Sequence, residues 1–332
     1  MRIGITGATG FLGTHFGMFA QGGGHDLIAY TRKQHGWPVL LASETFSQPK
    51  SAPHELPETK LNALVHLAGE SLMGLWTKTK RERIWKSRVE MTQGLVRHLG
   101  TWKAENRPRV LVCASGAGFY GDRGDDLLDE SSPSGAGFLA ELCVEWEKAA
   151  KEAEKLGMRV VMLRTGMVLG PDGGAFPLLK RVFGFGLGGR LGSGRQWMPW
   201  IHVEDAVGLI LRAVEQDSIR GPINLTAPEA VTNAIFTQTL ATTLHRPAFF
   251  HAPAFAMRLL LRGMADEMLL GSQRVNPRVA TDSGYTFAHP NLAGALASLL
   301  NQESGIRNLK SGISSWPRNK PPSASSTITT RR

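Results

Sequence analysis

The 332-residue sequence predicts an α/β fold, in which a doubly wound parallel sheet is followed by a smaller, mostly helical unit. Three observations lead to this prediction. Strand-like and helix-like segments alternate from the first residue, as parallel strands joined by crossover helices require. A glycine-rich turn separates the first strand from the first helix. After about residue 231, two helical stretches joined by HRPAFFHAPAF replace the alternation.

Short apolar runs bounded by small or polar residues predict the strands of the sheet. They lie at residues 1–6, 27–30, 63–69, 109–115, 159–166 and 222–227. Apolar residues at helical spacing predict the crossover helices, which lie at residues 11–21, 84–99 and 139–153. The first of these helices ends at the triplet GGG, and the polar, proline-containing residues 41–60 predict a long loop.

These elements divide the chain into three parts. Residues 1–230 form the sheet domain, and residues 231–300 form the smaller unit. Residues 301–332 are rich in Ser, Pro and Thr and have too little apolar surface to fold, so a disordered basic tail is expected there.

Charge and composition exclude several classes of protein. The net charge is +10, but residues 301–332 hold six basic residues against one acidic residue, so half of the excess lies in the tail and no nucleic-acid partner is expected. The chain has no apolar run of about 18 residues and no signal peptide, so we expect a cytoplasmic protein without a membrane span. Cys113 and Cys143 are expected to be buried, reduced thiols.

The stretch IGITGATGFLGTHF places Gly7, Gly10 and Gly13 between the first strand and the first helix. In this arrangement the first glycine permits a tight turn, the second lets backbone N–H groups approach a pyrophosphate, and the third allows the helix to pack on the strand. The phosphates then lie at a helix N-terminus, where free amides and the helix dipole favour negative charge. Because strand, turn and helix are all in place, the motif predicts a Rossmann-type dinucleotide-binding fold.

The end of the second strand predicts which dinucleotide binds. Enzymes that use NAD usually carry an acidic residue there, about 20 residues beyond the turn, which binds the ribose 2′-hydroxyl. This chain reads AYTRK, with no acid and with Arg32 at that place. A guanidinium group suits a 2′-phosphate, so NADP(H) is the predicted cofactor; an ordinary surface arginine is the alternative interpretation.

Further motifs resemble the extended short-chain dehydrogenase/reductase superfamily: TGATGFLG, VHLAG, GFYGD, LRTGMVLGP and WIHVEDA occur in the order seen there. HLAGESL, SRVEMTQGLV, GPDGGAF and NLTAPEAVTN more closely resemble the epimerase-like branch called family 39U, over residues 1 to about 300. The resemblance implies a Rossmann-type fold with a small C-terminal domain, NADP(H) binding and a relation to nucleoside-diphosphate-sugar epimerases. It implies no particular substrate.

We expect the cofactor to lie against the glycine turn, Arg32 and the carboxyl ends of the other strands. The expected contacts are Gly7, Thr9, Gly10, Phe11, Leu12, Gly13, Arg32, Leu67, Ala68, Gly69, Ser115, Arg164, Thr165, Gly166 and Met167.

The proton-transfer pair of the superfamily is missing from this chain. Most members use a Tyr as acid or base, with a Lys four residues later whose charge lowers the pKa of the Tyr. This chain has three tyrosines, and Gln34, Gly124 and His289 lie four residues after them. By register, Phe138 and Leu142 occupy the positions of the Tyr and the Lys.

Three other residues are candidates for proton transfer, which needs an acid or base within hydrogen-bond reach of the substrate. Glu70 follows the strand end HLAG, Tyr120 follows another strand end, and Glu141 lies at the start of a predicted helix. Each also has a structural interpretation, such as turn packing for Tyr120 and a solvated helix position for Glu141. Lys86 and Arg88 on the long helix are interpreted as surface charges.

Substrate-binding residues are expected in the glycine-rich segment 170–200 and at the strand end that follows it. Arg195 and Trp197 suit an anionic or ring-bearing substrate, and His202 lies in WIHVEDA, a segment that shapes the substrate side in extended relatives. The alternatives are a structural hairpin, a buried His202, and Asp205 as a helix N-cap. No residues have metal-ligand spacing, so no metal is expected.

The predicted function is that of an NADP(H)-dependent oxidoreductase or epimerase-like protein, acting on an unknown small molecule with non-standard acid and base residues. The alternative is a non-catalytic NADP(H)-binding regulator or sensor, in which the missing Tyr and Lys reflect lost chemistry. The sequence leaves the substrate, the direction of reaction and the oligomeric state open.

Overall fold

The structure, a computed structural model, describes residues 1–30 and 58–313, with the helical backbone alone for residues 303–313. Six parallel strands form its central sheet, and they confirm the six predicted strands. They are β1 (Arg2–Thr6), β2 (Asp26–Tyr30), β3 (Ala63–His66), β4 (Val110–Gly116), β6 (Arg159–Thr165) and β11 (Gly221–Leu225). Their spatial order is β11-β6-β4-β3-β1-β2, so the strand order reverses between β1 and β3. In open α/β sheets, ligands bind at the carboxyl ends of the strands beside such a reversal.

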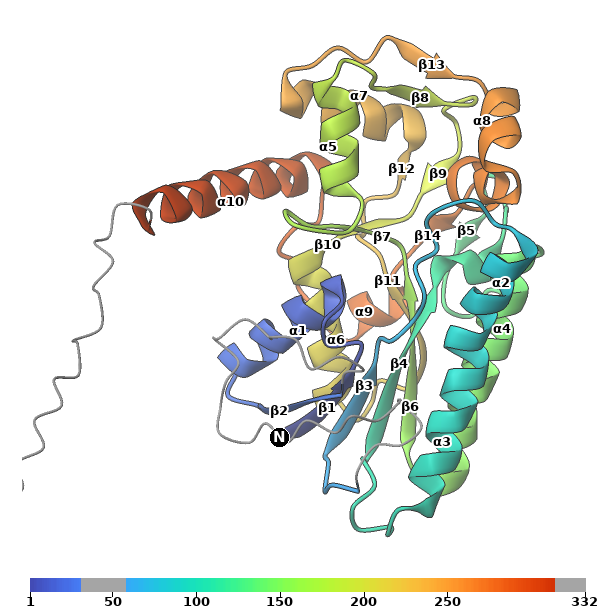
Figure 1. The fold of residues 1–332 in the computed structure, drawn as a ribbon, viewed down its shortest axis with the longest axis vertical. Coiled ribbons are helices and arrows are strands. Elements are labelled where there is room, and N and C mark those ends of the chain that lie inside the picture. Colours follow the sequence, from blue (N-terminus) through green and yellow to red (C-terminus); the bar gives the residue numbers. More distant parts are fainter. Residues whose placement is uncertain (31–57, 314–332) are drawn as a thin grey trace, which may run out of the picture.

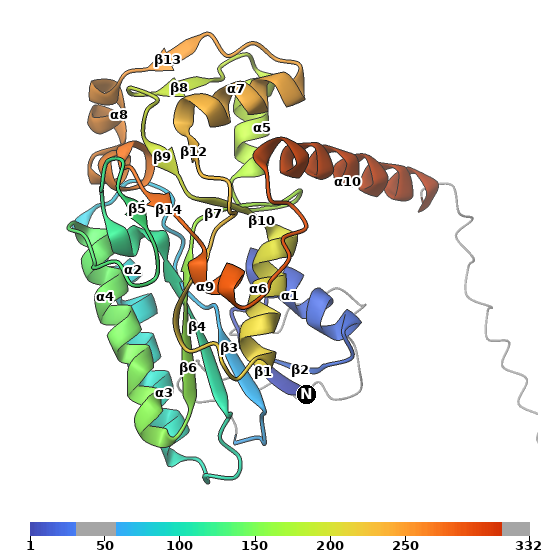
Figure 2. The ribbon, with the colours of Figure 1, turned by 180° about the vertical axis from the view of Figure 1, so that it is seen from behind.

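Helices cover both faces of the sheet (Figures 1 and 2). The helices α1 (Phe11–Gly22) and α6 (Val203–Glu215) lie on one face. The other face carries α2 (Lys78–Trp85), α3 (Met91–Thr101) and α4 (Phe138–Lys151). The helix predicted at residues 84–99 is interrupted, because the π-helical segment η2 (Lys86–Glu90) joins α2 to α3. Short 3₁₀ segments, η3 (Ala117–Tyr120) and η4 (Glu152–Leu156), follow β4 and α4.

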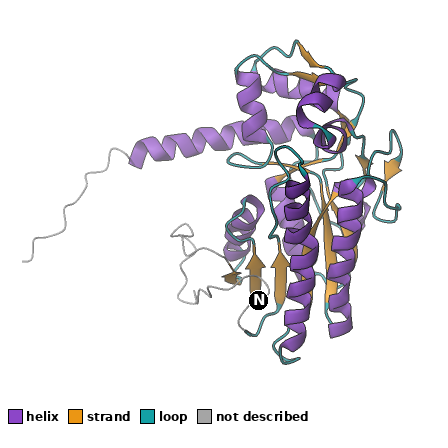
Figure 3. Ribbon diagram, turned by 45° about the vertical axis from the view of Figure 1, so that its right-hand side comes forward, coloured by secondary structure: helices purple, strands orange, loops and turns teal. Residues whose placement is uncertain are grey.

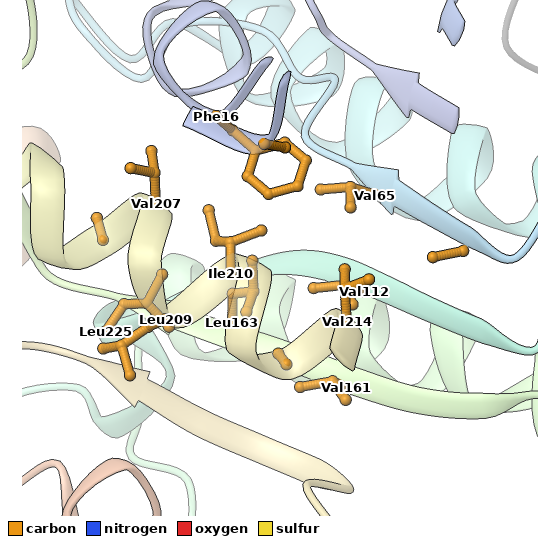
Figure 4. Packing of buried hydrophobic residues seen from close by; sticks show 14 of the residues in the cluster. Phe16, Val65, Val112, Val161, Leu163, Val207, Leu209, Ile210, Val214 and Leu225 are labelled. Atoms are coloured by element: carbon orange, nitrogen blue, oxygen red, sulfur yellow. The ribbon is translucent and has the colours of Figure 1, made fainter. Parts of the chain in front are cut away.

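Two apolar clusters, one on each face, hold the helices on the sheet. In β4, Val110 and Val112 belong to one cluster and Leu111 belongs to the other, because successive side chains of a strand point to opposite faces. Figure 4 shows the first cluster, in which Phe16 of α1 and Ile210 of α6 pack against the strands. Because both faces are covered, the strands read as nearly continuous apolar runs.

A smaller lobe lies over the carboxyl ends of the strands (Figures 1 and 3). Its helices are α5 (Phe176–Gly184), α7 (Asn233–Leu244), α8 (Ala254–Leu261), the π-helical η5 (Ala265–Leu270) and α10 (Leu292–Ile313). Phe176, Trp200, Phe236 and Leu296 share its apolar core. The short helix α9 (Arg278–Asp282) returns to the sheet, where Ala280 joins the first cluster.

Four pairs of short strands complete the fold around this lobe and its junction with the sheet domain. The pairs are β7 (Met167–Leu169) with β10 (Trp200–His202), β8 (Gly189–Leu191) with β13 (Phe250–Ala252), β9 (Trp197–Met198) with β12 (Val231–Thr232), and β5 (Leu127–Leu128) with β14 (Arg274–Val275). The pairings of β8 with β13 and of β9 with β12 join segment 170–200 to the chain beyond residue 230.

The C-terminal end of the fold differs from the expectation. The helix α10 continues to Ile313, so the backbone of residues 301–313 is helical within the segment predicted as a tail. Residues 314–332, which hold the rest of that tail, lie outside the described residues. Within the described ranges, no helix is both long enough and apolar enough to cross a bilayer.

Candidate functional site

The turn between β1 and α1 requires glycine at two of its three positions. Gly7 has φ +72°, and a Cβ there would lie 2.7 Å from the backbone of Leu67 and Ala68 at the end of β3. A Cβ on Gly13 would overlap the carbonyl oxygen of Gly7. The two glycines therefore let α1 start directly against the turn and let the turn approach the end of β3.

The N-terminus of α1 has no partner for its free amides among the described residues. Its N-cap is Gly10, which has no capping side chain, and the first turn holds no acidic residue. Thr9 and Gly10 are both exposed. Unpaired amides and the positive end of the helix dipole favour a bound anion. The residues present therefore fit the pyrophosphate of a dinucleotide.

Most of the other expected cofactor contacts lie at or near the carboxyl ends of the sheet strands. Leu12, Leu67, Ala68, Gly69, Thr165, Gly166 and Met167 all have some exposed surface. Phe11 packs under the glycine-rich loop 170–174, where a Cβ on Gly173 or Gly174 would meet its ring. Arg32 lies outside the described residues.

Arg164 and Ser115, two other expected contacts, belong to a closed polar network. Arg164 donates two hydrogen bonds of 2.9 Å to the carboxylate of Glu147, and Ser115 donates a third, also of 2.9 Å. Arg164 also donates to the Tyr120 hydroxyl at 3.1 Å, and its guanidinium lies 3.4 Å from the ring centroid of Phe119. All of these contacts are inside the protein, so the network stabilises the junction of β4, β6 and α4.

Tyr120, one of the three candidates for proton transfer, has no exposed surface. Its hydroxyl donates to Asn224 at 2.7 Å and accepts from Arg164, and burial raises the pKa of its phenol. Both hydrogen-bonding roles of the hydroxyl are thus filled by the protein. This geometry agrees with the structural interpretation of Tyr120, and a role in proton transfer stays a prediction.

The two glutamate candidates have different surroundings. Glu70 is partly exposed, forms an ion pair of 2.7 Å with Lys80, and donates its backbone N–H to the Ser87 hydroxyl. The hydrogen bond from Lys80 holds the pKa of Glu70 below its usual value, so this carboxylate is ionised at neutral pH. Glu141 is exposed in the first turn of α4.

The structure corrects the predicted register of the missing pair on α4. Leu139 contacts Gly118, and the Cys143 thiol contacts Gly116, so these two side chains face the end of β4. Phe138 instead lies 5.4 Å from the ring of Trp76, where it lines a pocket of about 570 Å³ on the α2 side. The slip by one residue arises because both pairs lie on the wide buried side of an amphipathic helix.

Arg88, for which the sequence predicts a surface position, is buried on η2. A Cβ on Gly69 would lie 3.3 Å from its Cζ, and its guanidinium lies 5.2 Å from the ring centroid of Trp146. A signal was present in the sequence, because Arg88 lies at helical spacing between Ile84 and Thr92 on the apolar stripe. A cation inside such a stripe predicts burial rather than exposure.

Arg195 and Trp197 lie on the segment that connects the lobe with the sheet domain. Arg195 is exposed. The indole N–H of Trp197 donates to Asp125 at 2.7 Å, and the Arg274 guanidinium lies 4.6 Å from its ring centroid. Trp197 thus has structural partners, whereas Arg195 is open to a ligand.

His202 is buried at the start of α6, where its Nδ1 accepts the backbone N–H of Glu204 as the N-cap. Asp205 does not cap the helix; its carboxylate accepts the backbone N–H groups of Ala288 and His289. His202, Glu204 and His289 bring possible metal ligands within 4.8 Å of one another. The centroids of the two imidazole rings lie 3.7 Å apart with the rings tilted by 32°, and the helix cap uses Nδ1 of His202, while its Nε2 has no hydrogen-bond partner among the described residues.

Comparisons with known proteins place this geometry in context. The model of the NAD dependent epimerase/dehydratase family matches residues 3–225, and a domain of unknown function (DUF1731) matches residues 252–299. An Arabidopsis thaliana protein named Epimerase family protein SDR39U1 homolog, chloroplastic, is 36% identical over 90% of this chain and 87% of its own length. Bacillus subtilis YfhF, also named an epimerase family protein, is 35% identical over 90% of this chain and 98% of its own length.

Solved structures show the same fold. Human epimerase family protein SDR39U1 (isoform 2), solved with NADPH, superposes with a TM-score of 0.79 and 32% identity, over 90% of this chain and 99% of that chain. The UDP-glucose 4-epimerase of Thermus thermophilus, solved with NAD, has a TM-score of 0.70 at 15% identity, over 92% of this chain and 99% of that chain. The second likeness concerns the fold alone.

Proposed function

This chain belongs to the NAD dependent epimerase/dehydratase family, and from that premise we propose that it is an NADP(H)-dependent oxidoreductase or epimerase acting on a small molecule. The uncapped N-terminus of α1, which Gly7 and Gly13 allow to pack against the turn, is the observation that carries the proposal. The similar human protein solved with NADPH supports the phosphorylated form of the cofactor.

The backbone of the glycine turn holds the pyrophosphate, and Arg32 holds the 2′-phosphate. The loop at Leu67, Ala68 and Gly69 lines the cofactor beyond the turn, because the turn touches this loop. A nicotinamide cofactor bound there would supply the hydride donor or acceptor for the substrate.

Glu70 is the best placed of the three candidates to accept a proton. It follows the carboxyl end of β3, on the side of the sheet where we place the cofactor. Its side chain is partly exposed, and the ion pair with Lys80 keeps it ionised. Leu139 and Cys143, which face the end of β4 on α4, offer no phenol and no ammonium group. This apolar pair is also the observation that favours the second candidate function, a non-catalytic NADP(H)-binding regulator.

The substitution Gly10→Asp tests cofactor binding. Asp is a good N-cap residue, so α1 should stay folded, with a change of only a few tenths of a kcal/mol in the free energy of unfolding. The same carboxylate occupies the place of the pyrophosphate and should weaken NADPH binding by about a hundredfold or more in calorimetry. Gly22→Asp, at the open far end of α1, is the matched control and should bind NADPH normally. Tight NADPH binding by Gly10→Asp would rule out this site.

Glu70→Gln separates the enzyme from the regulator. NADP⁺ reduction is followed with a panel of alcohols and nucleotide sugars, because oxidation of a substrate hydroxyl is the direction in which an ionised Glu70 accepts a proton. If Glu70 accepts the proton, Glu70→Gln should lower turnover by about 10²–10⁴-fold without weakening NADPH binding, whereas Glu141→Gln should be silent. Tight NADPH binding without any turnover across the panel would favour the regulator.

We also propose a cytoplasmic location and no nucleic-acid partner. The cysteines Cys113 and Cys143 are both free and buried, which suits a reducing compartment, and half of the positive excess lies in residues 301–332. The word chloroplastic in the name of the Arabidopsis relative applies to that protein. Cell fractionation with an antibody against the chain tests the location.

A further inference from the structure

Three arginines, Arg88, Arg159 and Arg164, are buried among the described residues, and their hydrogen bonds differ. Arg164 donates to Glu147, Tyr120 and a backbone carbonyl. Arg159 donates to three backbone carbonyls. Arg88 makes a single hydrogen bond, of 3.3 Å, to the Ser87 hydroxyl. Most of the five N–H donors of Arg88 are therefore left without a protein acceptor in the described part of the chain.

The groups that face Arg88 do not neutralise its charge. The Ser87 hydroxyl and the Trp146 ring are neutral, and burial raises the pKa of the Cys143 thiol to about 11, so it stays protonated. The carboxylate that acts on Arg88 is Glu70, and that group is already paired with Lys80 at 2.7 Å. A buried cation without a counter-ion is costly for a fold and is typical of a binding site.

Arg88 is nevertheless close to the surface at one point. Gly69 is exposed, and a Cβ added there would lie 3.3 Å from Cζ and 3.5 Å from both terminal nitrogens of Arg88. The absence of a side chain at Gly69 thus leaves the guanidinium accessible from the loop after β3. The same loop touches the glycine turn through Leu67 and Ala68, so the opening lies beside the cofactor.

We propose that Arg88 binds an anionic group of the substrate, a carboxylate or a phosphate. This inference rests on the proposed function and names the substrate class for that site. A guanidinium group can bind either anion with two parallel hydrogen bonds, and binding would supply the counter-ion that the protein does not. The proposed function places the cofactor pyrophosphate at the N-terminus of α1 and the 2′-phosphate at Arg32, which leaves Arg88 for the substrate.

Arg88→Met tests the proposal, because Met keeps much of the side-chain length and removes the charge. Calorimetry first measures NADPH affinity, and then oxalate and inorganic phosphate are titrated at fixed ionic strength, with and without NADPH. We expect NADPH affinity to stay within about twofold and anion affinity to fall at least about tenfold. Arg97→Met, which removes an exposed charge from α3, is the matched control and should bind both anions normally.

Gly69→Ala is a second variant that leaves Arg88 in place. Its methyl group would meet the guanidinium and should weaken anion binding several-fold, with no change in melting temperature beyond about one degree. Arg88→Met itself should change the free energy of unfolding by less than about 1 kcal/mol, since the side chain lacks a carboxylate partner.

The outcomes separate this inference from the proposed function. A protein that binds no NADPH contradicts the proposed function, whatever the anions do. A protein that binds NADPH but neither anion, or whose Arg88→Met variant binds oxalate and phosphate unchanged, overturns the inference alone. A tenfold loss of NADPH affinity in Arg88→Met also overturns it, because the anion would then belong to the cofactor.

Discussion

Two neighbouring residues of α4 meet two buried arginines, and the two contacts differ in kind. Glu147 binds Arg164 through both carboxylate oxygens, whereas Trp146 offers Arg88 only the face of its ring. Arg164 is enclosed on all sides by Tyr120, Phe119 and Glu147. Arg88 lies under the exposed Gly69 with one weak hydrogen bond.

The difference shows that burial of an arginine does not by itself indicate whether the residue stabilises the fold or binds a ligand. Arg164 was expected at the cofactor, yet Glu147 neutralises its charge and four of its five N–H donors have acceptors inside the protein. Arg88 was dismissed as a surface charge, yet it is the buried group with unused donors beside the site. A polar network whose hydrogen bonds are made within the protein stabilises the fold. A buried charge that has no counter-ion and lies near the carboxyl end of a strand is a candidate for ligand binding.

The largest loss of stability should come from breaking the hydrogen-bond network of Arg164 and Glu147. Arg164→Met leaves Glu147 buried without its cation and should lower the free energy of unfolding by about 3–5 kcal/mol. Arg88→Met removes a cation that has no carboxylate partner and should change it by less than about 1 kcal/mol, in either direction. Urea unfolding at pH 7.5 measures both.

A double substitution checks the cause of that loss. Adding Glu147→Gln to Arg164→Met removes the carboxylate that the first substitution leaves without its cation. The double variant should regain part of the free energy of unfolding, and the coupling energy between the two substitutions should be about 1–3 kcal/mol. Equal losses for Arg88→Met and Arg164→Met would abolish the distinction between the two arginines.

A smaller loss of stability should come from lowering the pH, because a buried histidine belongs to the hydrogen-bond chain that ends at Trp146. The Trp146 indole donates to Thr92, and Thr92 shares a hydrogen bond with His66, whose other nitrogen meets Thr6 at 2.6 Å. Burial lowers the pKa of His66 from 6.5 to about 4. The unfolded chain therefore binds a proton between these values that the folded protein does not. Stability should be complete above about pH 6.5 and fall as the pH drops toward 4, by up to about 3 kcal/mol for this residue.

Urea unfolding at several pH values between 7.5 and 4 measures how steeply the free energy of unfolding falls with pH. His66→Gln, which keeps two polar atoms but does not titrate, should flatten it; part of the slope should remain, because burial also lowers the pKa of His202 to about 4. A slope unchanged by His66→Gln would mean that His66 is protonated in the folded state.

Much of the fold could be predicted from local patterns. The six strands are apolar runs that end in small or polar residues, and Gly7, Gly10 and Gly13 lie between a strand and a helix. Period and turn chemistry are local properties, so a single sequence shows them. The extension of α10 to Ile313 was missed because its last turns have little apolar periodicity.

The candidate site was predicted less completely. Glu70 and Gly69 were expected because they follow a strand end. Arg88 and Glu147 were not, since a charged residue on a helix is usually solvated. Phe138 and Leu142 were chosen for positions that the structure assigns to Leu139 and Cys143. Neighbouring residues on the same wide apolar stripe cannot be told apart without knowing how the helix is rotated.

The sequence by itself determined the class of fold, the glycine turn and the absence of a Tyr–Lys pair, because these depend on residue types and their spacing along the chain. The tertiary structure decided which charges are satisfied. Glu147 and Arg164 are 17 residues apart, and Gly69 and Arg88 are 19 residues apart, so each contact depends on how a helix is rotated against the sheet. That rotation is set by apolar packing over the whole face of the sheet, and it leaves one guanidinium group bound and the other open.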